Sequence, residues 1–135
     1  MRRILFEPEH DLYRESVRSF LQRHVTPHYP AWEQASIVPR ELFTRAGELG
    51  AFAMAIPEEY GGAGLPDFRY NVILQEEAAG VGVGPAILGP CLQADVCLPY
   101  LLELTDEEQK ARWLPAVATG ECITAIAMTE PDTGS

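Results

Sequence analysis

Basic residues are scarce in this chain. Its 135 residues include 10 lysines and arginines against 20 aspartates and glutamates, for a net charge of −10. Nucleic-acid binding needs clustered positive side chains that neutralise phosphates, so nucleic acid is not expected as a partner. The same charge disfavours a peripheral role at anionic membranes. A local basic pocket for a phosphorylated ligand remains compatible with it.

Cysteine and long apolar runs are also scarce. Cys91, Cys97 and Cys122 form no C-x-x-C pair, so the sequence predicts neither a disulfide framework nor a zinc site. No apolar run approaches the roughly 20 residues that span a bilayer, so no membrane span is predicted. The opening "MRRILFEPEHD" is interrupted by acidic residues before a signal-peptide core can form. Together with the lack of an acid-poor amphipathic leader, this favours a cytoplasmic protein over a mitochondrial precursor, and a mature mitochondrial chain would look the same.

Helical periodicity dominates the first two-thirds of the chain. "EPEHDLYRESVRSFLQRHVTP" predicts a helix ended by Pro27, because apolar and aromatic residues recur every three or four positions. Its inward face is predicted to comprise Tyr13, Val17, Phe20, Leu21 and His24. "RELFTRAGELG" predicts a second helix, with Pro39 as its first residue and Gly50 just past its end. "FRYNVILQEEAAG" predicts a third, ended by "GVGVG".

The last third predicts two more helices and one strand. "PAILGPCLQADVCLPYLLEL" is largely apolar all round and predicts a buried helix, bent or broken near Pro99. "TDEE" predicts a helix start, with Thr105 as N-cap and Glu108 at the capping-box position. Only "CITAIAMT" has the composition of a strand. The fold class is therefore all-α, and the sheet that would pair with this strand is expected outside the given sequence.

Most chemistry-bearing patterns in the chain fail on spacing. Gly62 and Gly64 are followed by Asp67 where a dinucleotide fingerprint needs a third glycine, and "GVGVGPAILG" lacks both that glycine and a Lys-Ser/Thr pair. His24 and His28 have zinc-ligand spacing, but Pro27 stands between them, so no metal site is predicted. No nucleophile–histidine arrangement is recognisable, and no catalytic residue is assigned.

The C-terminal "MTEPDTGS" admits two interpretations. Thr129 and Ser135 offer hydroxyl groups, Pro131 restricts the turn, and Gly134 lets the backbone approach a ligand closely. Such a segment can present main-chain N–H groups to a polar ring edge or a phosphate. An ordinary turn has the same composition, so the residues alone leave both interpretations open.

Four segments resemble the acyl-CoA dehydrogenase family. "AIAMTEPDTGS" resembles its flavin-binding signature, a hydrophobic strand followed by T-E-P, two variable residues and G-S. "PEEYGGAGL", "TDEEQKARWLPAVATGE" and "LYRESVRSFLQRHVTPHYPAWE" are similar to other family segments, in wording closest to the long-chain members. The resemblance implies the family's N-terminal helical domain at residues 1–121 and the first strand of its middle β-domain at residues 122–135.

The resemblance also implies an activity. Family members carry out FAD-dependent α,β-dehydrogenation of acyl-CoA thioesters in fatty-acid β-oxidation, and electron transfer flavoprotein reoxidises the flavin. The intact enzyme is expected to be a homo-oligomer, and its catalytic base would come from a C-terminal helical domain, so this chain alone is expected to be inactive. The alternatives are an acyl-CoA oxidase of the same fold and a short helical module that binds without catalysis.

Site residues follow from the resemblance, position by position. The segment from Ile126 to Ser135 would border the flavin, with backbone contacts from Met128 and a hydroxyl contact from Thr129 to the isoalloxazine. Gly134 belongs to the same cofactor segment, and Ser135 would lie near the FAD pyrophosphate and the CoA thioester. The buried helix would form a wall of the acyl-chain cavity, with Leu92, Gln93 and Val96 as candidate substrate contacts. Apolar surface left uncovered on this helix predicts self-association.

Overall fold

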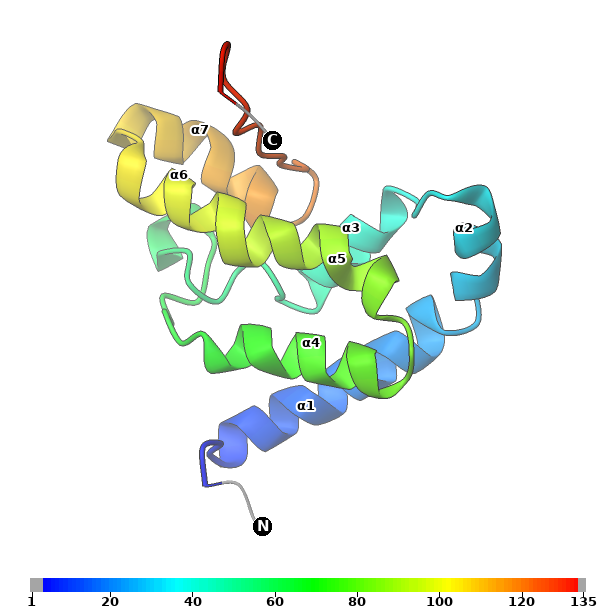
Figure 1. Cartoon of the computed structure of the whole chain (residues 1–135). Helices are drawn as coiled ribbons and strands as arrows, with labels where there is room; N and C mark the ends of the chain where they lie inside the picture. Colours follow the sequence, from blue (N-terminus) through cyan, green and yellow to red (C-terminus); the bar gives the residue numbers. More distant parts are fainter. Residues whose placement is uncertain (1–3, 134–135) are drawn as a thin grey trace.

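The computed structural model describes residues 4–133, which fold as an all-helical domain (Figure 1). No strand occurs within this range, and the predicted all-α fold class is confirmed. Two π-helical turns, η1 (Leu21–Val25) and η3 (Gln93–Cys97), and one 3-10 turn, η2 (Glu58–Tyr60), interrupt or join the α-helices. Those α-helices are α1 (Pro8–Phe20), α2 (Tyr29–Ala35), α3 (Glu41–Glu48), α4 (Arg69–Gly80), α5 (Gly84–Leu92), α6 (Leu98–Leu104) and α7 (Glu107–Ala118).

The helices enclose two clusters of buried side chains. Figure 1 shows α4 between α1 and the long α5–α6 helix, with α7 beside α6. The larger cluster lies among α1, α3, α4 and α5, and includes Val17, Phe52 and Ile73, each at most 1% exposed. The smaller cluster joins α6 and α7 through Leu98, Leu114 and Val117. Full burial of each such side chain contributes roughly 1.5–3 kcal/mol, so these clusters supply the main stabilisation of the fold.

The π-turn η1 changes which residues of the first helix face inward. The Thr26 N–H donates to the Leu21 carbonyl at 2.8 Å, a five-residue span that inserts one extra residue into the turn. Val25 is therefore fully buried, whereas His24 is exposed. The predicted inward position of His24 is wrong, because the periodicity argument assumed 3.6 residues per turn throughout.

The second π-turn, η3, keeps the α5–α6 helix continuous. The Leu98 N–H donates to the Gln93 carbonyl across the wider π-turn, and Pro99 follows as the second residue of α6. The irregularity thus precedes Pro99, and the chain does not break there. The resulting helix, Gly84–Leu104, has 21 residues and is long and apolar enough to cross a membrane, contrary to the expectation from sequence. Core helices of soluble domains pass the same test, and this helix packs against α4 and α7.

Helix boundaries differ from the predictions at three places. The Pro-rich joint contains the short helix α2, which the sequence did not predict. Helix α3 begins at Glu41, two residues after Pro39. The N-cap of α7 is Asp106, whose side chain accepts from the Gln109 N–H at 2.8 Å, so the capping box lies one residue beyond the predicted position.

Helices α3 and α7 meet through two glycines. A Cβ atom on Gly47 would lie 2.1 Å from the Thr119 carbonyl oxygen, and one on Gly120 would lie 2.1 Å from the Phe43 carbonyl oxygen. Gly120 also has a φ of +74°, a left-handed conformation that side chains disfavour. This close approach fixes where the chain leaves α7. A hydrogen bond from the Arg40 guanidinium to the Glu121 carbonyl holds the next residue.

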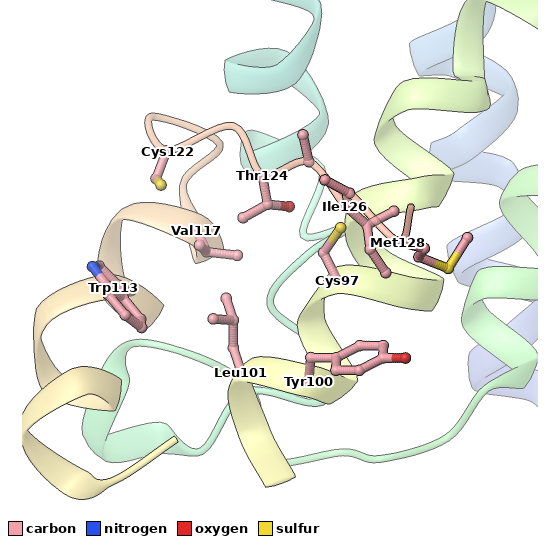
Figure 2. A pocket seen from close by; sticks show the side chains of 11 residues that line it. Cys97, Tyr100, Leu101, Trp113, Val117, Cys122, Thr124, Ile126 and Met128 are labelled. Atoms are coloured by element: carbon pink, nitrogen blue, oxygen red, sulfur yellow. The ribbon is translucent and has the colours of Figure 1, made fainter. Parts of the chain in front are cut away.

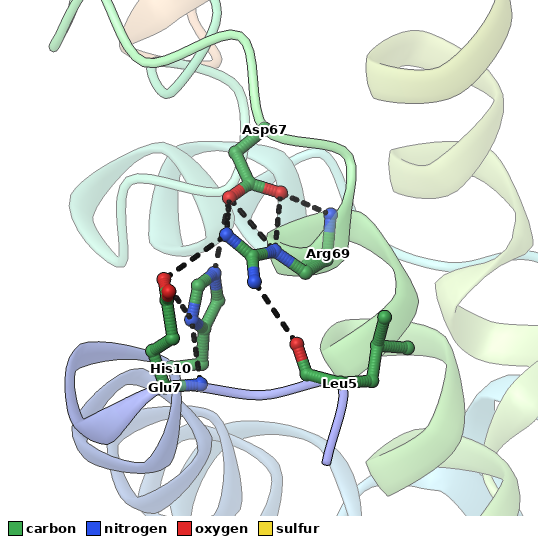
Figure 3. A network of polar contacts seen from close by, with 5 residues as sticks. All are labelled: Leu5, Glu7, His10, Asp67 and Arg69. Atoms are coloured by element: carbon green, nitrogen blue, oxygen red, sulfur yellow. Dashed lines mark hydrogen bonds and ion pairs between the residues drawn. The ribbon is translucent and has the colours of Figure 1, made fainter.

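A polar network fastens the start of α1 to the start of α4 (Figure 3). His10 is buried, and its Nδ1 accepts from the Glu7 N–H at 3.2 Å, so its Nε2–H donates to the Asp67 carboxylate at 3.2 Å. Arg69 donates to the same carboxylate at 2.6 Å and to the Leu5 carbonyl at 2.9 Å. His10 also lies close enough to Glu7 and Glu9 for a metal site, but both its ring nitrogens already have protein partners.

Candidate functional site

The segment after α7 is extended and unpaired within the described residues. Cys122, Thr124 and Ile126 are half-buried, whereas Ile123, Ala125 and Ala127 between them are exposed. This alternation is the period-two geometry of a strand. The predicted strand nevertheless is not formed as part of a sheet, because residues 4–133 offer it no partner, and the only β-bridge in that range joins Glu130 to Thr133.

Gln93 holds this segment against the helices. Its side chain is fully buried, and its Nε2 donates to the Val117 carbonyl of α7 at 3.5 Å. Its Oε1 accepts from the Thr124 N–H at 3.0 Å. A second anchor is the Cys122 N–H, which donates to the Ala116 carbonyl at 2.8 Å. Gln93, predicted as a substrate contact, has its amide oxygen and nitrogen bonded within the chain and does not line the hollow that Leu92 and Val96 line.

The anchored segment forms one wall of an apolar cavity of about 580 Å³ (Figure 2). Helices α6 and α7 provide the other walls. Ile126 lines the cavity, and Met128 lies at its end with 77% of its surface exposed. Within residues 4–133, the main-chain groups of residues 126–129 have no hydrogen-bond partner, and Thr129 is exposed. The other lining residues include Cys97, Tyr100, Leu101, Trp113 and Val117. Gly134 and Ser135, also predicted here, lie outside the described residues.

Leu92 and Val96 both line a second hollow, which we call the α4–α5 groove. Its volume is about 350 Å³, and α4, α5 and η3 provide its walls. The apolar lining includes Ile87, Leu88 and Cys91, and the polar lining residues are Gln75 and Asp95. The structure therefore brings together two of the three predicted substrate contacts. It also adds Asp95, which the sequence analysis did not single out, although an acid within an otherwise apolar helix is a visible signal.

Asp95 is held by two amides of α4. The Asn71 amide nitrogen donates to one carboxylate oxygen at 2.6 Å, and the Gln75 amide nitrogen donates to the other. Burial raises the pKa of Asp95, while the two amide donors oppose that rise. Burial, with a further contribution from Asp95, raises the pKa of the neighbouring Cys91 thiol to about 12. The groove therefore places a carboxyl group held by two amide donors beside a thiol whose ionisation is suppressed by burial.

Comparisons with known proteins agree with this architecture. The acyl-CoA dehydrogenase N-terminal domain family matches residues 7–121. A long-chain specific mitochondrial acyl-CoA dehydrogenase from Sus scrofa is 41% identical over 98% of this chain and 30% of its own length. A (2S)-methylsuccinyl-CoA dehydrogenase from Cereibacter sphaeroides is 34% identical over 96% of this chain and 23% of its own. The chain spans about 30% of the long-chain relatives it matches.

Solved structures of acyl-CoA dehydrogenases and related proteins share the fold of this chain. An acyl-CoA dehydrogenase from Geobacillus kaustophilus superimposes with a TM-score of 0.89 at 41% identity, covering 99% of this chain and 34% of that one. A glutaryl-CoA dehydrogenase from Mycobacterium smegmatis in complex with FADH2 gives 0.80 at 29% identity, covering 97% and 33%. An electron transferring flavoprotein structure from Acidaminococcus fermentans gives 0.80 at 28% identity, covering 98% and 34%.

The fold is thus that of the helical domain found in the solved acyl-CoA dehydrogenase structures. The chain belongs to the acyl-CoA dehydrogenase family and corresponds to its N-terminal domain.

Proposed function

We propose that this chain forms one wall of the flavin and acyl sites of an FAD-dependent acyl-CoA dehydrogenase that acts in fatty-acid β-oxidation. The observation that carries the proposal is the anchored segment, whose unpaired main chain runs over an apolar cavity and ends in T-E-P. A flavin ring has an apolar face and a polar edge, so it needs an apolar surface beside main-chain donors and acceptors. Residues 126–129 offer both.

The residues of the segment have separate roles in this proposal. Ile126 supports the ring, the Met128 backbone and the Thr129 hydroxyl bind its polar edge, and Gly134 and Ser135 continue toward the pyrophosphate and the CoA thioester. FAD, when bound, accepts the hydride from the substrate β-carbon. Gln93 and Cys122 keep the segment close to α7, so the groups that bind the ring edge are held in place before the cofactor arrives.

The acyl chain is assigned to the α4–α5 groove, where Leu92 and Val96 form part of an apolar wall. The catalytic base is proposed to come from a part of the enzyme outside this chain. Among the described residues that line the groove, Asp95 is the only acid, and both of its oxygens already accept hydrogen bonds. Electron transfer flavoprotein is the proposed electron acceptor and a homo-oligomer the proposed assembly, both on family resemblance.

Anaerobic flavin bleaching tests the proposal. The flavin-loaded enzyme that contains this domain is mixed with a saturated long-chain acyl-CoA, and the visible flavin absorbance is followed. We expect loss of the oxidised-flavin band with the acyl-CoA and no change with free CoA. A flavin that no acyl-CoA reduces would contradict the dehydrogenase assignment, and rapid oxygen consumption by the reduced enzyme would indicate an oxidase.

A further inference from the structure

We propose that Asp95 makes the α4–α5 groove discriminate against acyl groups that end in a free carboxylate, so that its substrates are acyl-CoA thioesters with uncharged tails. The inference rests on the proposed function, because it specifies the substrate class of the same groove. The groove has an apolar wall suited to a hydrocarbon chain, yet the acid Asp95 lies in that wall.

The carboxylate of Asp95 is fixed in place. It lies in the π-turn η3, on the side of the helix that faces α4. Asn71 and Gln75 are four residues apart on α4, and one amide donates to each carboxylate oxygen. Two acceptor oxygens are the pattern of an ionised carboxylate, because a protonated acid would present one donor. A side chain held from both sides does not rotate away when a ligand enters.

The described part of this chain offers no positive charge in the groove to offset a second carboxylate. Among the described residues that line it, none is lysine, arginine or histidine. Arg14 and Arg18, both on α1, are paired with another acid, because they donate to Glu77 at 2.6 and 2.7 Å. An acyl carboxylate entering the groove would lose water, gain no counter-ion and lie beside a like charge. Each of these effects opposes binding.

This property would separate the chain from some of its relatives. Two of the similar proteins are named for glutaryl-CoA and (2S)-methylsuccinyl-CoA, whose acyl groups carry a second carboxylate. At 29–34% identity, family membership alone does not decide between such acyl groups and neutral ones. A fixed anion in the groove does distinguish the two, because it repels an acyl group that carries a carboxylate. This repulsion changes binding more than the gain or loss of one methylene in a neutral acyl chain.

The test compares three substrates on the flavin-loaded enzyme that contains this domain. They are a saturated acyl-CoA, its equal-length analogue with a terminal carboxylate, and the methyl ester of that analogue. We expect kcat/KM for the carboxylate to be lower than for the neutral chain on the order of 100-fold, and the ester to recover most of the loss. Recovery with the ester attributes the loss to charge rather than length, and this comparison needs no variant.

Two variants locate the effect. Asp95→Asn keeps the shape of the side chain and removes its charge. We expect the preference for the neutral acyl-CoA over the carboxylate analogue, measured as the ratio of their kcat/KM values, to fall about tenfold. Asp11→Asn removes a charge from the exposed face of α1 and is expected to leave the ratio unchanged. Equal turnover of neutral and carboxylate chains by the native enzyme, or an unaltered ratio in a folded Asp95→Asn enzyme, would overturn the inference. A native flavin that the neutral acyl-CoA does not reduce would instead overturn the proposed function, and this inference with it.

Discussion

The Thr124 backbone N–H donates to the side-chain oxygen of Gln93 at 3.0 Å, although the two residues are 31 positions apart. This hydrogen bond joins the α5–α6 helix to the extended segment that carries the proposed flavin contacts. Because Gln93 is fully buried and also donates to α7, one side chain connects three parts of the domain. The position of the segment therefore depends on a residue outside it.

Gln93→Leu is expected to release the segment. Leucine fills a similar volume, but it leaves the Thr124 N–H without its partner, while the Val117 carbonyl keeps its bond from the Gly120 N–H at 3.0 Å. Loss of a buried hydrogen-bond partner costs roughly 1–3 kcal/mol in the free energy of unfolding. We expect a lower unfolding midpoint in urea, together with faster hydrogen exchange at the Thr124 amide, measured by NMR. Gln22→Leu, at an exposed position of η1, is the matched control and should change neither quantity. Unaltered Thr124 exchange in Gln93→Leu would show that the bond does not hold the segment.

Gly120→Ala is expected to disrupt the contact between α3 and α7. The added methyl group would lie 2.1 Å from the Phe43 carbonyl oxygen, and alanine would have to adopt a φ of +74°. Left-handed strain and overpacking together should lower the free energy of unfolding by about 3 kcal/mol. Gly82→Ala separates the two causes, because Gly82 has a φ of +75° with nothing within 4 Å of the added Cβ. That variant should lose about 1 kcal/mol in the same urea titration. Equal losses would argue against the close approach.

Asp67→Asn is expected to lower stability most at neutral pH, and by less as the pH falls below the unfolded-state pKa. The Arg69 guanidinium, aided by the Arg69 and His10 N–H groups and opposed by desolvation, holds the pKa of Asp67 well below its usual range. A depressed folded-state pKa stabilises the protein above the unfolded-state pKa, about 3.9, and this contribution is lost as pH falls through the folded value. Because Asp67 is partly solvated, we expect a loss of only about 1 kcal/mol at pH 7. Urea unfolding of native protein and variant between pH 7 and pH 3 should show the two converging in acid. A difference that grew on acidification would reverse the assigned sign.

The sequence predicted the helices best where the apolar period is regular. The first predicted inward face holds as far as Leu21 and then fails at His24, because η1 inserts a residue that no spacing rule anticipates. The α7 capping box was placed one residue early, since Thr105 and Asp106 are both good N-caps by composition. In the structure the Thr105 hydroxyl donates back to the Leu101 carbonyl of the preceding helix, which leaves Asp106 to cap α7.

The same limit applies to the candidate site. Leu92, Gln93 and Val96 lie within five positions of one another, and the family resemblance assigned all three the same role. Leu92 and Val96 are four positions apart, so they share a face of the helix and line the groove, whereas Gln93 faces α7 and the segment. The importance of Asp95 depends on Asn71 and Gln75 in a different helix, which a reading along one helix does not reveal.

Cys91 is expected to resist alkylation in the folded protein. The thiolate is the reactive form, and burial, reinforced by the Asp95 charge, raises the pKa of this thiol to about 12. At pH 8 the folded protein therefore holds far less Cys91 thiolate than the unfolded chain, whose cysteines have a pKa near 8.5. Iodoacetamide labelling followed by peptide mass mapping should show slow modification of Cys91 in buffer and fast modification in urea. Asp95→Asn removes the Asp95 charge, which is the smaller cause of the raised Cys91 pKa. The variant should therefore have a lower thiol pKa and modestly faster labelling, while the larger effect of burial remains. Native labelling of Cys91 as fast as in urea would contradict the burial of this wall of the groove.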